Sequence, residues 1–144
     1  MWPKDCPFCN IQESQIFKEV MDNISSDISE QFIVIKDRFP ISKGHSLIVT
    51  KKDFFHITDL PAQYMTSLQI VIRETKYVLE NMYKPDGFNI GINESRAAGQ
   101  TIFHFHMHII PRYKGDVLNP RGGIRRILPD RSGYNYDENH HCRV

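Results

Sequence analysis

The distribution of apolar and polar residues predicts four strands and one long helix. Residues 32–37 and 45–50 are rich in β-branched side chains and are separated by a loop that contains Pro40 and Gly44, which predicts an antiparallel pair. Residues 87–93 form a third strand, because apolar residues alternate there with small or polar ones. Between 61 and 83, apolar residues recur at helical spacing after a predicted N-cap at Asp59. The expected buried stripe of this helix is Met65, Leu68, Val71, Ile72, Val78, Leu79 and Met82.

The fourth strand, residues 104–110, has the most unusual pattern in the chain. Three histidines, His104, His106 and His108, alternate with large apolar residues. Side chains of a strand point to opposite faces in turn, so the imidazoles share one face while the apolar residues anchor the other. A single histidine there is best explained as an ordinary polar surface residue. Three in strict alternation indicate a site for phosphate chemistry or for a metal ion.

The remaining segments have weaker patterns. Ile16, Phe17, Val20 and Ile24 predict a short helix, which the serines at 25, 26 and 29 interrupt. Residues 124–129 fit a short strand or an extended arm, and residues 130–144 have little apolar content and are expected to be loosely ordered. Because one helix interrupts the strands and does not alternate with them, the order favours an antiparallel α+β fold.

Composition narrows the class of protein. A chain of 144 residues with 40% hydrophobic residues supports one domain, and a net charge of +1 argues against a dedicated nucleic-acid binder. We expect no secretory signal and no membrane span, and three cysteines, an odd count, favour reduced thiols and a cytoplasmic location. Residues 111–131 are basic, as suits either an anionic substrate or a solvated tail.

Cys6 and Cys9 are three positions apart, as in half of a structural zinc site. The pair alone does not complete a site, since zinc needs further ligands. Two unliganded thiols remain the ordinary alternative, and a redox pair would require a strand before Cys6.

Together these residues resemble the histidine triad (HIT) family of nucleotide hydrolases and transferases. The resemblance covers residues 32–112 and rests on the triad, on the flanking residues 99–101 and 111–112, on Asp37 and His45, and on Asn93. Residues 111–123 resemble a bacterial-type branch described as diadenosine polyphosphate hydrolases. It implies an α+β fold with a five-stranded antiparallel sheet and two helices, assembled as a homodimer. Residues 1–115 would form the domain and residues 116–144 a C-terminal arm.

The resemblance also implies roles for individual residues. His106 is expected to attack the α-phosphorus of an adenine nucleotide and to form a covalent nucleotidyl-histidine. His108 and His45 are expected to donate hydrogen bonds to phosphate oxygens, and His104 to position the site or bind zinc. The expected nucleotide-binding residues are Asp37 at the ribose, His108, and the loop residues Asn93, Gly99, Gln100 and Thr101. No cofactor is expected for catalysis.

Structural zinc is also implied by the resemblance. The expected ligands are Cys6, Cys9, His104 and a histidine after the second strand, where this chain has Asp53. His56, three residues later, would require a local shift, and Asp53 is the alternative ligand.

Three classes of function fit the sequence. The first is hydrolysis of nucleotides, with diadenosine polyphosphates as the expected substrates and phosphoramidates or acyl-nucleotides as the alternative. The second is a nucleotide-binding regulatory protein with little turnover. The third, a metal-centred protein, ranks last because alternate residues of a strand lie about 7 Å apart.

Overall fold

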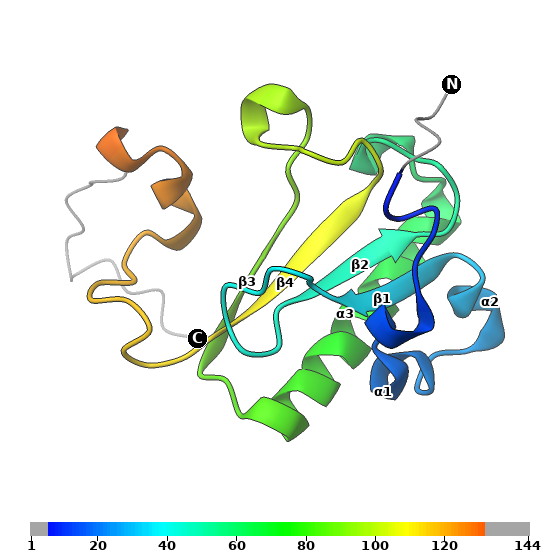
Figure 1. Cartoon of the computed structure of the whole chain (residues 1–144), viewed down its shortest axis with the longest axis horizontal. Coiled ribbons are helices and arrows are strands. Elements are labelled where there is room, and N and C mark those ends of the chain that lie inside the picture. The colour runs from blue at the N-terminus through cyan, green and yellow to red at the C-terminus, as the bar shows by residue number, and fades with distance from the viewer. Residues whose placement is uncertain (1–5, 132–144) are drawn as a thin grey trace. The chain divides into compact units, whose positions relative to one another are not determined.

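The strands of the computed structural model, which describes residues 6–131, form one antiparallel sheet (Figure 1). The strands are β1 (Phe32–Lys36), β2 (Ser46–Thr50), β3 (Gly87–Gly91) and β4 (His106–Arg112). Their order is β1-β2-β4-β3, so the histidine strand β4 lies inside the sheet with β2 and β3 on either side.

The expected fifth strand is not present among residues 6–131. Its nearest equivalent is a single bridge between Ile16 and Ile35, outside β1. Phe17 continues this contact by donating its N–H to the Val34 carbonyl at 2.8 Å. Because this short pairing lies between a 3-10 turn at Glu13–Gln15 and a helix that begins at Lys18, it cannot extend into a strand.

The prediction of two helices is also wrong, since the described residues form three α-helices. These are α1 (Lys18–Met21), α2 (Ser26–Ser29) and α3 (Ala62–Tyr83). The single helix expected before β1 is divided, and the serines expected to interrupt it flank and form α2. Serine at a helix start is favourable, so a serine cluster is as compatible with a new helix as with an interruption.

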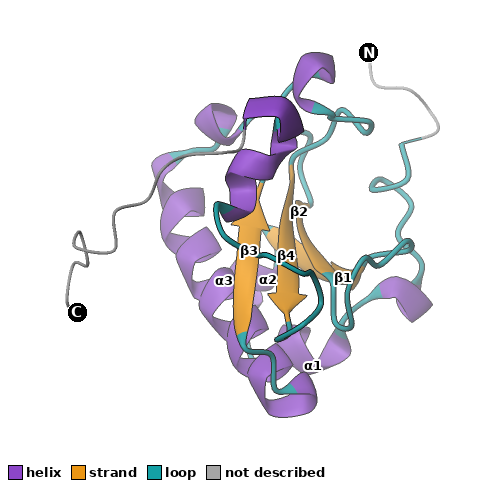
Figure 2. Cartoon of the chain, turned by 90° about the vertical axis from the view of Figure 1, so that its left-hand side faces the viewer, coloured by secondary structure: helices purple, strands orange, loops and turns teal. Residues whose placement is uncertain are grey.

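Helix α3 covers one face of the sheet, as Figure 2 shows, and has nearly the predicted bounds. Its N-cap is Pro61 and not Asp59, because the Asp59 carboxylate instead accepts the His56 N–H at 2.9 Å. Met65 and Met82, predicted to be buried, are 43% and 44% exposed. The buried stripe includes Tyr64, whose ring packs against Phe32 and Phe54, so the helix is rotated from the predicted orientation.

The register of the strands separates two faces. The face that α3 covers carries a large core. Strands β1, β2 and β4 each contribute to it, through Phe32, Val34, Ile48, Met107 and Ile109. The opposite face carries the histidines of β4 beside a smaller apolar cluster of Ile35, Leu47 and Val49. Residues directly opposite in the ladder share a face, so Leu47 and Gly91 flank His108. Gly91 has no side chain, which leaves space beside the histidines.

The histidine strand begins two residues later than predicted. The Phe105 N–H donates to the Phe54 carbonyl at 2.6 Å and the His104 N–H to the Ile102 carbonyl at 2.9 Å, so these two N–H groups bond outside the ladder. The alternation nevertheless continues through it, since Phe105, Met107 and Ile109 are all buried in the core.

The chain divides into two compact units, Met1–Tyr113 and Lys114–Val144. In the second unit, residues 124–129 are neither a strand nor an extended arm, because Gly123–Ile127 and Pro129–Arg131 form 3-10 helices. Gly122 and Gly123 have φ values of +87° and +44°, and the turn that they form begins the first of these two 3-10 helices. The loose order predicted for residues 130–144 lies, from residue 132 onward, outside the described residues. Within the described part of the chain, no helix has the length and apolar character needed to span a membrane.

Candidate active site

The imidazole of His106 is held in a single tautomer. Its Nδ1 lies 2.8 Å from the backbone carbonyl oxygen of His104, so Nδ1 carries the proton and donates it to that oxygen. The lone pair of the neutral ring is then on Nε2. His106 is 7% exposed, and burial lowers its pKa, which favours the neutral form. The ring can therefore act as a nucleophile through Nε2 near neutral pH.

A hydrogen-bond chain fixes the two other imidazoles of the site. The Ile41 N–H donates to His45 Nδ1 at 3.3 Å, so the proton of neutral His45 is on Nε2. That Nε2–H lies 3.0 Å from His108 Nδ1 and 3.4 Å from Asp37 Oδ2. His108 Nδ1 is thus an acceptor, and its Nε2–H is available to donate to a ligand. His45 contacts His108 directly, which places it behind that donor.

His45 and His108 are also held neutral, because burial lowers the pKa of each. Burial lowers the pKa of His45, with a smaller opposing effect from Asp37. The pKa of His108 falls to about 4, first because of burial and then because of the neighbouring His106 and His45. Asp37 is anchored at the end of β1, where its Oδ1 accepts the Phe39 N–H at 2.7 Å. The site consequently offers neutral N–H donors beside one carboxylate.

The loop between β3 and β4 carries the other predicted nucleotide-binding residues. Gln100 is buried and clamps the loop: its Oε1 accepts the Ser95 N–H at 2.8 Å and its N–H donates to the Ser95 carbonyl at 3.1 Å. Ser95 has a φ of +69°, a costly conformation for a residue other than glycine. Gly99 has a φ of +89°, and Thr101 is exposed. Continuing the β3–β4 register beyond Gly91 would bring Asn93 opposite His106.

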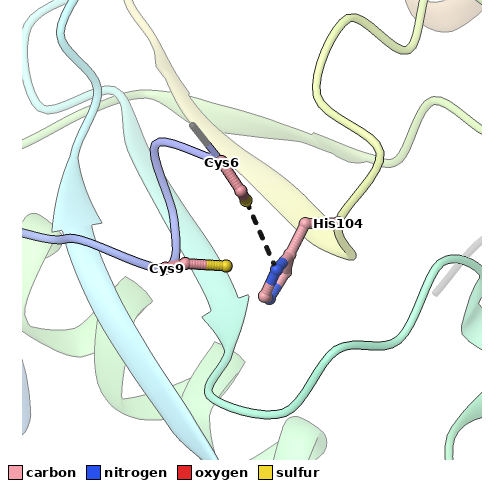
Figure 3. A group of neighbouring side chains, drawn as sticks. All are labelled: Cys6, Cys9 and His104. Atoms are coloured by element: carbon pink, nitrogen blue, oxygen red, sulfur yellow. Dashed lines mark hydrogen bonds between the residues drawn. The ribbon is translucent and has the colours of Figure 1, made fainter. Parts of the chain in front are cut away.

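A second cluster combines the first triad histidine with the two N-terminal cysteines. The ligand atoms of Cys6, Cys9 and His104 all lie within 4.8 Å of one another, and Figure 3 shows the three side chains converging. The Asp53 Oδ1 lies 3.8 Å from Cys9 Sγ and 3.7 Å from His104 Nδ1. His56 is outside this group, with its Nδ1 3.8 Å from Asp59 Oδ2.

The group of Cys6, Cys9 and His104 has part of the geometry of a zinc site, and Asp53 lies beside it without joining the set of ligand atoms that are all within 4.8 Å of one another. Tetrahedral zinc with bonds of about 2.0–2.3 Å keeps its ligand atoms about 3.3–3.8 Å apart. Cys6 Sγ lies 3.8 Å from His104 Nδ1, within this range, as do the two contacts of Asp53. The His104 Nε2–H donates to the Thr50 carbonyl at 2.6 Å, so the Nδ1 lone pair faces the thiols. The sequence had not indicated Thr50, whose backbone fixes this tautomer.

The three triad histidines do not converge on one ion. Among the described residues, two groups have metal-ligand geometry, and each contains one triad histidine: Cys6 with Cys9 and His104, and Asp37 with His45 and His108. In the second group, the Ile41 N–H on His45 Nδ1 leaves the facing Nε2 protonated and unsuited to bind a metal.

Phe8 is a further residue that the sequence did not single out. Its ring centroid lies 5.0 Å from that of His106 and 5.9 Å from that of His104. An aromatic residue between two cysteines was the available signal, but the pattern alone does not show what the ring contacts.

Comparison with known proteins identifies similar chains. A family model described as "HIT domain" matches residues 26–115. A bis(5'-adenosyl)-triphosphatase of Dictyostelium discoideum is 30% identical over 128 residues, which cover 89% of this chain and 80% of that protein. Adenylylsulfatase HINT3 of Arabidopsis thaliana is 33% identical over 124 residues, 85% of this chain and 59% of that one. A solved structure of a Zn-bound histidine triad family protein from Mycobacterium smegmatis is 31% identical, with a TM-score of 0.60 and 80% of each chain covered.

Proposed function

The chain belongs to the histidine triad family, and from this premise we propose that it hydrolyses nucleotides through a covalent intermediate on His106. The observation that carries the proposal is the 2.8 Å contact between His106 Nδ1 and the His104 carbonyl. This contact leaves the Nε2 lone pair for attack on phosphorus, and the strand sets the position of the residue that carries it.

The proposed reaction has two steps. In the first, His106 Nε2 forms a bond to the α-phosphorus, and the bond between that phosphorus and the leaving-group oxygen breaks. The leaving group takes the bonding electron pair. In the second, water attacks the same phosphorus, the phosphorus–nitrogen bond breaks, and a nucleoside monophosphate is released with the water's proton lost to solvent or buffer. Splitting one difficult hydrolysis into two displacements lowers the barrier of each.

We assign roles to His108 and His45 from their contacts, and to Asp37 and the loop residues from the family resemblance. His108 would donate its Nε2–H to a non-bridging phosphate oxygen, where negative charge grows in the transition state. His45 would orient His108, since its Nε2 lies 3.0 Å from His108 Nδ1. Asp37 would bind the ribose hydroxyls, and Gln100 would shape the loop that carries Asn93, Gly99 and Thr101 toward the phosphates.

A single-turnover experiment tests this proposal. Wild-type protein in excess over radiolabelled nucleotide is expected to form acid-labile, protein-bound nucleotide, and His106→Asn to form none. A matched control is His56→Asn, because His56 lies outside the triad; this variant should retain labelling. If His106→Asn bound as much radiolabel as the wild-type protein, the assignment of His106 would be refuted. Circular dichroism would verify that the variants fold alike.

The leaving group is a separate part of the proposal. We propose diadenosine polyphosphates, supported by the likeness to the triphosphatase of Dictyostelium discoideum. The likeness to a plant adenylylsulfatase adds adenylyl sulfate as a second candidate, beside the acyl-nucleotides and phosphoramidates that the family resemblance implies. Values of kcat/KM across diadenosine tri- and tetraphosphate, adenylyl sulfate and an adenosine phosphoramidate would rank them. Tight nucleotide binding without turnover of any of these would instead favour a regulatory protein.

We also propose structural zinc at Cys6, Cys9, His104 and Asp53. The donor set supports it, with two thiols, an imidazole whose Nδ1 lies 3.8 Å from Cys6 Sγ, and a carboxylate within 3.8 Å of Cys9 Sγ. Such an ion would fasten the N-terminal segment to the start of β4 and supply no step of the hydrolysis. Metal analysis of protein purified without added zinc should find about one equivalent. Less than about a tenth of an equivalent would reject the site.

A homodimer is the remaining proposal, and the edge position of β3 supports it. Among residues 6–131, β3 pairs on one side only, with β4, and its residues are half-buried. Sedimentation equilibrium at micromolar concentration should give twice the chain mass, and a monomer mass would refute it.

A further inference from the structure

The Phe8 ring lies directly against the proposed nucleophile. Its centroid is 5.0 Å from that of His106, with 58° between the ring planes, and 5.9 Å from that of His104 in an edge-on arrangement. The same side chain packs on the apolar cluster of the histidine face, which consists of Ile35, Leu47 and Val49. Phe8 therefore contacts both the apolar cluster and the proposed nucleophile His106.

The turn that carries Phe8 is held on both sides of this residue. The Cys9 N–H donates to the Cys6 carbonyl at 3.0 Å, which closes the turn over Pro7 and Phe8. Cys6 is buried, and its Sγ lies 3.8 Å from His104 Nδ1. Figure 3 shows both cysteines of this turn pointing toward the His104 ring. The position of Phe8 is consequently set by contacts that lie outside the phosphate site.

The His106 ring is held by a hydrogen bond at one edge and by two neighbouring rings. The hydrogen bond at Nδ1 sets the rotation of the imidazole about its Cβ–Cγ bond. The His108 ring lies on a second side, with its centroid 5.3 Å away. The Phe8 ring is a third contact that limits small shifts of Nε2, and a near-attack geometry is sensitive to shifts of about 1 Å.

We propose that Phe8 is a positioning residue that holds the His106 imidazole in the direction needed for attack on phosphorus. This inference rests on the proposed function and adds a residue to it. Phe8 acts through His106, so its loss lowers the rate of nucleotidyl transfer and leaves substrate affinity nearly unchanged. A contact with the nucleobase would have the opposite signature, a higher KM at an unchanged rate.

The test compares Phe8→Ala, Phe8→Tyr and the control Ile11→Ala. Ile11 packs against the same apolar cluster as Phe8. Phe8→Ala is expected to slow the single-turnover nucleotidylation rate by about tenfold or more, with KM within about twofold of wild type. Phe8→Tyr keeps the aromatic ring and is expected to stay within about threefold of the wild-type rate. Ile11→Ala is expected to match wild type in rate.

An NMR measurement follows the ring contact without any turnover. The carbon-bound protons of the His106 imidazole lie near the Phe8 ring and are shifted by its ring current. Their chemical shifts should change in Phe8→Ala, and should stay close to wild type in Phe8→Tyr and Ile11→Ala. Thermal melts identify any variant that loses its fold, in which case Phe8→Leu replaces Phe8→Ala.

The outcomes separate this inference from the function on which it rests. An unchanged rate in Phe8→Ala, a rise in KM alone, or an equal rate loss in Ile11→Ala would each overturn the positioning role. If wild-type protein forms no nucleotidyl-His106, the proposed function fails. The NMR comparison then still decides the contact, because unaltered His106 proton shifts in Phe8→Ala would refute it.

Discussion

The depressed pKa of His108 predicts a specific dependence of stability on pH. Burial, followed by the neighbouring His106 and His45, lowers this pKa from 6.5 to about 4. Below about pH 6.5 the unfolded chain therefore binds a proton that the folded protein does not. The resulting stabilisation is complete above the unfolded pKa and is lost as the pH falls toward the folded value of about 4.

The size of the effect follows from the shift. Linkage gives a loss of about 2 kcal/mol in unfolding free energy between about pH 7.5 and about pH 5. The His108 side chain is 24% exposed. Solvent screening reduces the expected loss to about 1 kcal/mol. This loss of unfolding free energy comes from His108 alone. A variant without a titratable side chain at position 108 should therefore not show it.

The measurement is urea unfolding of wild type and His108→Gln at both pH values, followed by circular dichroism. His108→Gln should lose about 1 kcal/mol less than wild type on acidification, whatever its stability at neutral pH. Equal losses in the two proteins, within about 0.3 kcal/mol, would refute the reasoning. A pKa of 6 or above for His108 in a direct NMR titration would refute its premise.

Three further predictions concern residues outside the histidine row. Asp53→Asn should weaken zinc binding by at least about tenfold, measured by competition with a chromophoric chelator, whereas Asp53→His should retain it; equal affinities would exclude Asp53 as a ligand. Gln100→Ala should lower the unfolding free energy by about 1–2 kcal/mol, because the Ser95 N–H loses its acceptor, and Gln100→Glu should lose less; the reverse order in urea unfolding would contradict the loop clamp. Gly44→Ala should cost about 2–3 kcal/mol in thermal denaturation, since Gly44 has a φ of +88° and a Cβ would lie 2.8 Å from the Tyr83 ring; a loss below about 0.5 kcal/mol would contradict this packing.

The pattern of apolar and polar residues correctly predicted the elements that depend on residues close to one another in the sequence. The alternation in residues 104–110 placed Phe105, Met107 and Ile109 in the core, and the β-branched runs gave β1 and β2 within one residue at each end. Helix α3 also has nearly the predicted bounds. These features follow from side-chain periodicity, which a sequence displays directly.

Errors arose where a partner distant in sequence decided the outcome. The segment before β1 forms a bridge and two short helices because Phe17 bonds to Val34, a contact that no local pattern encodes. The rotation of α3, which buries Tyr64 and exposes Met65, depends on the rings of Phe32 and Phe54 beneath it.

The sequence by itself determined the chemistry available to this protein, namely three imidazoles on one strand face, with Cys6, Cys9 and Asp37 elsewhere in the chain. The family resemblance already separated His104, with the two cysteines, from His106 and His108, and only the tertiary structure decided the contacts that each ring makes. His104 turns its ring toward the thiols, and its carbonyl holds His106 at 2.8 Å, so one residue serves both groups. Tautomers depend on which backbone group faces each ring nitrogen. That choice is made by folding, because the Thr50 carbonyl reaches His104 across the sheet and the loop between β1 and β2 turns the Ile41 N–H back onto His45.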